Sequence, residues 1–238
     1  GSSVVKVCEL TVAATGLNEK AAQAAGLSYE KIVLSPLSHA GYYPGGKLMT
    51  MKVLYEKGSQ RLLGAQIVGQ EGVDKRIDVL ATAMQAGLPV TALKDLDLAY
   101  APPYASAKDP VNLVGFMAEN LEQGVVKQFH WEDVAGLPRD GSVTLLDART
   151  PGEYSGGCAE GFVNVPLDEL RDRLGEIAPG KPVYVMCQSG LRSYLACRIL
   201  AQNGYDCYNF SGGYRFYESV LLDRWTRQNA YPCGVERP

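Results

Sequence analysis

The chain has 238 residues, of which 46% are hydrophobic and 21% are charged, a balance that is typical of a folded globular protein and excludes a disordered one. Its net charge of −3 excludes the basic surface that nucleic-acid binding needs, and no segment offers the ~20 apolar residues of a membrane span. We find no signal peptide at the N-terminus and expect a cytoplasmic protein with one large domain or two small ones.

Six cysteines are scattered along the chain without a Cys-x-x-Cys pair, and only two histidines accompany them. A metal site is therefore not expected, and free thiols in a chain of this size and composition indicate a reducing compartment. Five of the six cysteines lie at or after Cys158. Any thiol chemistry therefore belongs to the second half of the chain.

The first half predicts an α+β arrangement, because strands are followed by long amphipathic helices. Asn18 is the predicted N-cap of the first helix, and Asp109 followed by Pro110 predicts the start of the last one. In chain order, we predict strands over residues 3–13, 29–34, 47–55 and 61–68, and helices over residues 18–26, 72–86 and 109–120.

The segment Glu122-Gln123-Gly124 has the composition of a linker and predicts two domains, residues 1–124 and residues 125–238. Beyond it, short apolar strands alternate with helices, which predicts an α/β domain with a mainly parallel sheet covered on both faces. Its predicted strands are 143–147, 163–166, 182–187 and 207–210, and its predicted helices are 167–175, 191–203 and 214–228.

Cys187 ends the predicted strand 182–187, and a polar turn with Gly190 leads from it into a helix. Ligands bind at the carboxyl ends of parallel strands, and the free N–H groups of the helix N-terminus, with Arg192, would favour a thiolate there. The same cradle would hold an anionic persulfide, so no base is required. Without this context, a cysteine that ends a buried strand is usually a core residue.

Other segments of the second half complete a wider pattern; they are residues 146–149, 153–154, 157–166, 187–192 and 211–213. With them, residues 126–228 resemble the rhodanese (sulfurtransferase) family. The resemblance implies that Cys187 accepts a sulfane sulfur as a persulfide. It implies that the anionic donor is bound by Arg192 and the amides of Gln188, Ser189, Gly190, Leu191 and Ser193. Cys158 and Phe162 depart from the family, which often has His and Ala there.

Alternatives to this interpretation remain open. Four residues separate Cys187 from Arg192, one fewer than in related phosphatases, so a phosphate-processing enzyme is disfavoured. A domain that only binds or senses thiols and anions is the main alternative to an enzyme. Asp147 and Arg149 fit a catalytic role or an ion pair that holds the walls of the site. Cys197 and Cys207 are interpreted as packing residues and Cys233 as an exposed one.

The first half has no Gly-x-Gly-x-x-Gly or Walker loop but has two Tyr/Pro-rich loops, residues 42–46 and 100–104, which by composition are ordinary surface turns. With residues 10–18, 64–72 and 99–112, the first 120 residues resemble the C-terminal dimerisation domain of flavin-dependent pyridine nucleotide-disulfide oxidoreductases. The coenzyme A-disulfide reductase or NADH-dependent persulfide reductase branch is the most similar. The resemblance implies that Tyr42 and Tyr100 reach across a homodimer interface toward a coenzyme A thiol or persulfide.

These resemblances together imply the C-terminal part of a longer enzyme that reduces coenzyme A disulfide or persulfides. The parent enzyme would use FAD and NAD(P)H on further domains, whose Gly-rich loops have no counterpart in the 238 residues. No cofactor site is therefore expected to be complete in this chain. The predicted partners are a small sulfur donor, a thiol acceptor and a second copy of the chain.

Overall fold

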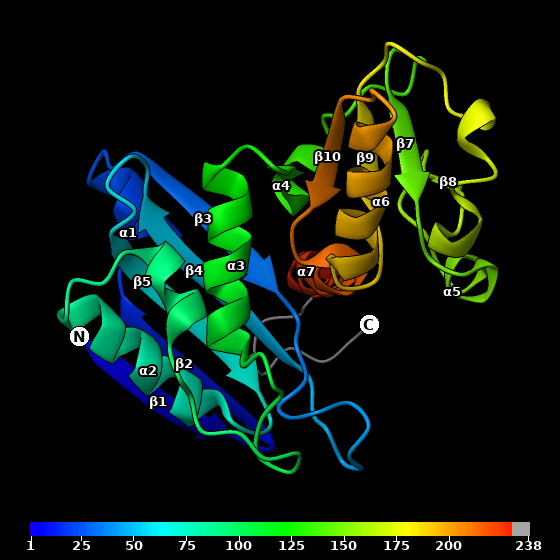
Figure 1. Cartoon of the computed structure of the whole chain (residues 1–238). Helices are drawn as coiled ribbons and strands as arrows, with labels where there is room; N and C mark the ends of the chain where they lie inside the picture. The colour runs from blue at the N-terminus through cyan, green and yellow to red at the C-terminus, as the bar shows by residue number, and fades with distance from the viewer. Residues whose placement is uncertain (230–238) are drawn as a thin grey trace.

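A computed structural model describes residues 1–229 and shows two units, each built on a five-stranded sheet (Figure 1). The first sheet is antiparallel, in the order β1-β2-β5-β4-β3, and α2 and α3 lie over one of its faces. The elements of this unit are β1 (Ser2–Val7), β2 (Leu10–Gly16), α1 (Glu19–Ala24), β3 (Tyr29–Leu34), β4 (Met49–Glu56), β5 (Leu62–Gly69), α2 (Val73–Gln85), the 3₁₀ helix η1 (Val90–Asp95) and α3 (Pro110–Glu122).

The predicted caps are present where the helices begin. The Asp109 carboxylate accepts a hydrogen bond from the Val111 amide at 3.0 Å, and the Asn112 side chain accepts one from the Asp109 amide at 3.0 Å. The side chain of Asn18 caps α1 in the same way, by accepting from the Ala21 amide. Each cap satisfies a backbone N–H that has no partner within the helix, and such a cap typically contributes about 1 kcal/mol.

The predicted strand over residues 3–13 is wrong in one respect, because the segment folds as the β1–β2 hairpin. Cys8 and Glu9 form the turn, with Cys8 at a φ of 52°, and Val7 is paired with Leu10. The segment carries apolar side chains on both faces, and its turn contains no glycine or proline. The sequence therefore has no break at the point where the chain reverses.

The second sheet is parallel throughout, in the order β6-β10-β9-β7-β8, as predicted for an α/β domain. Its unit contains β6 (Lys127–Phe129), α4 (Trp131–Val134), β7 (Thr144–Asp147), α5 (Pro151–Ser155), β8 (Val163–Asn164), the 3₁₀ helices η2 (Leu167–Glu169) and η3 (Leu174–Glu176), β9 (Val183–Met186), α6 (Leu191–Gln202), β10 (Cys207–Phe210) and α7 (Gly213–Asn229). Within residues 1–229, none of the helices combines the length and the apolar character needed to cross a bilayer.

The two faces of the second sheet are both covered. On β9, Val183 and Val185 pack into a core with α6, whereas Met186 and the ring of Tyr184 belong to a second core with Phe210. Alternate residues of a strand point to opposite faces, so this near-continuous apolar strand supplies both cores.

The helix predicted over residues 167–175 is two short 3₁₀ helices, η2 and η3. The amides of Glu169 and Ile177 bond to carbonyls three residues earlier, and between the two turns the buried Leu170 fills the core. Leucines at 167, 170 and 174 have the spacing of an α-helix, but spacing does not distinguish one long helix from two 3₁₀ turns that bury the same side chains.

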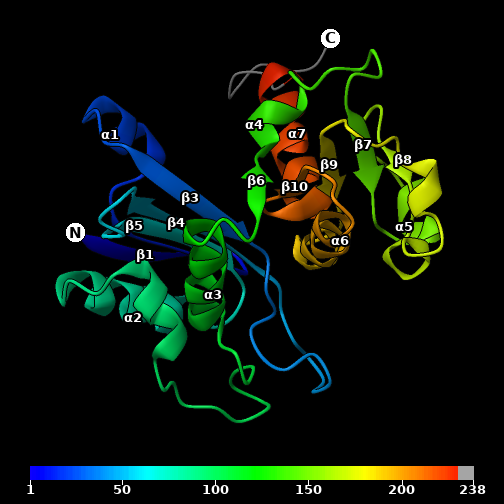
Figure 2. The same ribbon diagram turned by 45° about the horizontal axis from the view of Figure 1, so that its top comes forward.

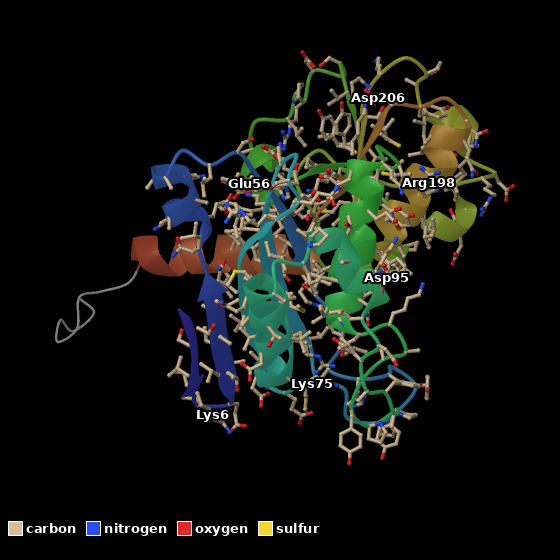
Figure 3. All side chains as sticks on the ribbon, turned by 60° about the vertical axis from the view of Figure 1, so that its left-hand side comes forward. Lys6, Glu56, Lys75, Asp95, Arg198 and Asp206 are labelled. Atoms are coloured by element: carbon tan, nitrogen blue, oxygen red, sulfur yellow. The ribbon has the colours of Figure 1, made fainter. Side chains whose placement is uncertain are left out.

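The second unit lies beside the free edge of β3 (Figure 2), and side chains attach it there. Gln128 donates to the Lys31 carbonyl at 2.8 Å, and the Ser211 hydroxyl accepts from the Val33 amide at 3.1 Å. The Lys31 ammonium also pairs with Glu132 at 2.7 Å. Arg198, labelled in Figure 3, donates to a carbonyl of the connecting segment after α3. These contacts fix the second unit against the first.

Candidate active site

Cys187 lies between β9 and α6, at the carboxyl edge of the parallel sheet. Strand β9 has β10 on one side and β7 on the other, so the residue is at the centre of this edge. Gly190, with a φ of 100°, is the N-cap of α6 and turns the chain from the strand into the helix. The positive φ explains the glycine of this loop, because other residues rarely adopt it.

Two donors contact the sulfur of Cys187. The Gly190 amide lies 3.1 Å from Sγ, and the Ser193 hydroxyl lies 3.2 Å from it. The Ser193 side chain is buried, and its Oγ is also 3.2 Å from the Gly190 carbonyl, so one hydroxyl hydrogen serves two acceptors. A thiolate accepts hydrogen bonds better than a thiol, so both donors stabilise negative charge on the sulfur.

The Cys187 loop is supported from behind by the segment that begins α7. The Tyr214 amide donates to the Cys187 carbonyl at 2.8 Å, and the Arg215 amide donates to the Gln188 carbonyl at 3.2 Å. A Cβ on Gly213 would lie 2.5 Å from the backbone nitrogen of Ser189. The Ser-Gly-Gly motif at 211–213 therefore has a structural reason, since only glycine lets the two backbones approach this closely.

Asp147 and Arg149 form the ion pair that was one of their two predicted roles. Arg149 Nη2 lies 2.7 Å from Asp147 Oδ2, and both side chains are buried. The same guanidinium donates to the Gly157 carbonyl at 2.7 Å and to the Gln188 side chain at 3.3 Å. A buried pair with these further hydrogen bonds holds three segments of the site together.

Arg192 is paired with Glu153 on α5. Its terminal nitrogens donate to the two carboxylate oxygens at 2.6 and 2.7 Å. This pairing, with hydrogen bonds from Thr150, lowers the pKa of Glu153 to about 2 against the opposing effect of burial. An anionic donor that binds Arg192 must therefore either lie beside the Glu153 carboxylate or displace it from the guanidinium. The role of Arg192 in donor binding stays a prediction. No part was predicted for Glu153.

The sulfur is covered, because Cys187 is 0% exposed. The loop around it is partly open to solvent, and Leu191 is its most exposed residue. A donor molecule can therefore reach the sulfur only after neighbouring groups move.

The other cysteines occupy different environments. Cys197 and Cys207 are buried, and the Cys207 thiol donates to the Cys197 carbonyl at 3.2 Å, which agrees with a packing role. The hydrogen bond to Cys207 and burial raise the pKa of the Cys197 thiol. Cys158 is exposed, and Cys233 lies outside the described residues. Among the side chains that the structure describes, no group of His, Cys, Asp and Glu is arranged to hold a metal ion.

The two predicted tyrosines come together in the first unit. The hydroxyls of Tyr42 and Tyr100 lie 2.6 Å apart, and this hydrogen bond raises the pKa of Tyr100. Tyr42 is 75% exposed, so the pair projects from the surface. In the described part of the chain, no hydrogen bond or ion pair joins these tyrosines to the Cys187 loop.

Arg76 ties together the loops that carry these tyrosines. It pairs with Asp109 at 2.9 Å and donates to the carbonyls of Ser38 at 2.8 Å and Tyr104 at 3.5 Å. A cavity of about 600 Å³ lies beside it, between the two loops and α2. Lys75, labelled in Figure 3, lines this cavity and donates to the Ala99 carbonyl at 3.4 Å.

Known proteins are similar to both halves. Residues 2–110 match the dimerisation domain of the pyridine nucleotide-disulphide oxidoreductases, and residues 130–219 match the rhodanese-like domain. A coenzyme A disulfide reductase from Staphylococcus haemolyticus is 40% identical over 121 residues, which are 51% of this chain and 27% of that protein.

Two solved structures cover both halves. Reduced Bacillus anthracis CoADR-RHD is 47% identical with a TM-score of 0.90, over 94% of this chain and 40% of that one. A NAD-dependent persulfide reductase from A. fulgidus is 39% identical with a TM-score of 0.80, over 90% of this chain and 38% of that one. This chain thus spans less than half the length of these relatives. Both resemblances inferred from the sequence are confirmed: the chain contains a pyridine nucleotide-disulphide oxidoreductase dimerisation domain followed by a rhodanese-like domain.

Proposed function

We propose that this chain transfers sulfane sulfur through a persulfide on Cys187. The observation that carries the proposal is the pair of hydrogen bonds to Sγ, from the Gly190 amide and the Ser193 hydroxyl, at the N-terminus of α6. Both donors and the helix dipole stabilise an anionic sulfur, which is the form that attacks a donor and the form that is released after transfer.

The reaction has two displacement steps. The Cys187 thiolate attacks the outer sulfur of a donor such as thiosulfate; a new S–S bond forms, and the S–S bond of thiosulfate breaks. Sulfite leaves with the electron pair. An acceptor thiolate then attacks the outer sulfur of the persulfide, and the Cys187 thiolate leaves. The two steps need no external oxidant or reductant, and the same two hydrogen bonds stabilise the thiolate before and after them.

We further propose that the chain functions as part of an enzyme that reduces coenzyme A disulfide or persulfides with NAD(P)H and FAD. The support is the similarity to the two relatives that contain both domains, one of them a persulfide reductase. The flavin and nicotinamide sites would lie in the part of those relatives that this chain does not span. Residues 1–124 and 125–238 are the proposed domains, and Gly124 follows the end of α3. The Tyr42–Tyr100 pair would face coenzyme A across a dimer.

A second candidate function is a rhodanese-like domain that binds or senses thiols without transferring sulfur. Two observations favour it: Cys187 is fully buried, and Arg192 is already paired with Glu153. In that case the donor would not reach Sγ.

Intact-mass measurement after incubation with thiosulfate separates the two. We expect the wild-type chain to gain one sulfur atom and to lose it when cyanide is added, and Cys187→Ser to gain none. Cys158→Ser is the matched control, since its thiol is exposed, and it should behave as wild type. The absence of any gain in the wild type would favour the binding domain, and a gain that persists in Cys187→Ser would contradict the proposed site.

A further inference from the structure

The turn of residues 211–215 lies directly behind the Cys187 loop. A Cβ on Gly213 would lie 2.6 Å from the carbonyl carbon and oxygen of Gln188. The two amides that follow Gly213 donate to the carbonyls of Cys187 and Gln188, at 2.8 and 3.2 Å. Two consecutive backbone bonds, and an approach too close for any side chain, leave the loop little freedom relative to the turn. The loop therefore takes its position from residues 211–215.

Ser211 holds this turn against the first domain. Its hydroxyl accepts from the Val33 amide at 3.1 Å and lies 3.4 Å from the Val33 carbonyl, so one side chain meets both backbone groups of a residue on the free edge of β3. The Ser211 amide donates to the Phe129 carbonyl at 2.9 Å. Ser211 and Val33 are each 2% exposed. Because water is excluded from this contact, nothing would replace the hydroxyl after its removal.

Gly212 connects the contact at Val33 to the contact at the loop. A Cβ on Gly212 would lie 2.9 Å from Val33 Cγ1, so the turn approaches β3 as closely as it approaches the loop. Gly212 and Gly213 have φ values of 96° and 73°, a conformation that other residues rarely adopt. The backbone passes from β3 to the loop within three residues, without a side chain that could absorb a shift. A displacement of Ser211 from Val33 would therefore displace the loop.

We propose that Ser211 is a positioning residue for Cys187: its bond to Val33 fixes the turn, and the turn fixes the loop donors that face the sulfur. The Gly190 amide lies 3.1 Å from Sγ. A hydrogen bond weakens steeply as its angle departs from ideal, so a small displacement of the loop would weaken the stabilisation of negative charge on the sulfur. The dimerisation domain thereby supports the site through β3, although Gly190 and Ser193 both belong to the rhodanese-like domain.

Ser211→Ala removes the hydroxyl, and Gln128→Met is the matched control. Gln128 also bonds across the domain boundary, at 2.8 Å to the Lys31 carbonyl and at 3.0 Å to Glu30, but it lies on β6 and not on the turn. Each variant loses a contact between the domains, and the ion pair of Lys31 with Glu132 at 2.7 Å remains in both. Only Ser211→Ala loosens the turn behind the Cys187 loop.

Hydrogen exchange of the Gly190 amide, measured by NMR on the 238-residue chain, tests the positioning. We expect exchange about tenfold faster in Ser211→Ala than in the wild type, and unchanged in Gln128→Met. A general loss of stability would speed exchange in both variants. Ser211→Cys, which keeps the size of the side chain and only a weak hydrogen-bonding group, carries the same test if the alanine variant does not fold. Wild-type exchange in Ser211→Ala, or an equal increase in the control, would overturn the proposal.

The rate of sulfur gain from thiosulfate is the second readout, and it rests on the proposed function. We expect Ser211→Ala to gain sulfur on Cys187 about tenfold more slowly at saturating thiosulfate, and Gln128→Met to match the wild type. A wild-type chain that gains no sulfur would contradict the proposed function, while the exchange of the Gly190 amide still decides whether Ser211 positions the loop. Wild-type sulfur gain in a Ser211→Ala chain with faster exchange would contradict a role of Ser211 in sulfur transfer.

Discussion

At the level of single residues, the Glu153–Arg192 pair determines the charge at the rim of the Cys187 loop. The pairing lowers the pKa of Glu153 from an ordinary value of 4.5 to about 2. A lowered carboxyl pKa contributes stability that is fully present above about pH 4.5 and is lost as the pH falls through about 2. Both side chains are about one third exposed, so solvent screening limits this contribution to roughly 1 kcal/mol or less.

Arg192→Gln should move the titration of Glu153 upward, toward 4.5, because the largest cause of its low pKa is removed. NMR of the side-chain carboxyl carbon of Glu153 between about pH 1.5 and 6, a range that brackets both values, reports the midpoint directly. Arg173→Gln is the matched control, since Arg173 pairs with Glu169 and Glu176 on another surface. An unchanged midpoint in Arg192→Gln would show that Arg192 is not the partner in solution.

The candidate site could be predicted from sequence only where its residues are local. Cys187, Gly190 and Ser193 lie in one strand-turn-helix pattern, and the structure brings them into contact. Glu153 is 39 residues from Arg192. Its capping box with Thr150 gives it a complete local explanation, so nothing in the sequence points to a distant partner.

At the level of elements, a hydroxyl of the second domain supplies the partner of one backbone amide at the edge of β3. Ser211 accepts from the Val33 amide and lies 3.4 Å from the Val33 carbonyl. Because the amide is buried, Ser211→Ala should leave it without a partner and lower the free energy of unfolding by about 1–2 kcal/mol. Urea denaturation of wild type and variant measures the difference.

Ser35→Ala is the matched control for this substitution. Ser35 is also buried and lies near the same boundary, but its hydroxyl has no hydrogen-bond partner among the described residues. Its removal should leave the free energy of unfolding unchanged or slightly higher. Equal losses in the two variants would mean that buried volume, and not the hydrogen bond to β3, stabilises this contact.

Elements were predictable where a cap and apolar spacing agree, as in α3; α2 and α6 begin at glycines without a side-chain cap. Strand β6 was not predicted, because three residues carry too little pattern and its position is fixed by parallel pairing with β10, about 80 residues later. The β1–β2 hairpin was taken for one strand because its turn lacks the residues that usually mark a turn. The first error comes from pairing that is distant in the sequence, and the second from a local turn without marker residues.

At the level of the whole molecule, one face of the first sheet is exposed and apolar. The register pairs Val5 with Val12, Val7 with Leu10, and Val12 with Val68, so these side chains share a face. All five are exposed. Helices α2 and α3 cover the opposite face. A contiguous exposed patch of valine and leucine on an edge hairpin is typical of a surface that another chain or domain covers.

We expect the dimerisation domain to self-associate through this face. A lysine at Val5 would place a charge in the centre of the patch, and burying it in an interface would weaken association by at least about tenfold. Sedimentation equilibrium over a range of protein concentrations measures this effect.

Val4→Lys is the control within the same strand. Val4 is exposed but is paired with the buried Ala13, so it lies on the other face of the sheet from Val5. Lys6, labelled in Figure 3, is two residues later and shares the face of Val4. The same charge at Val4 should therefore leave association close to that of the wild type. Equal weakening by both substitutions would indicate a general effect of charge on β1. If Val5→Lys associates as the wild type does, the interface lies elsewhere, and the apolar face must be covered by a different domain.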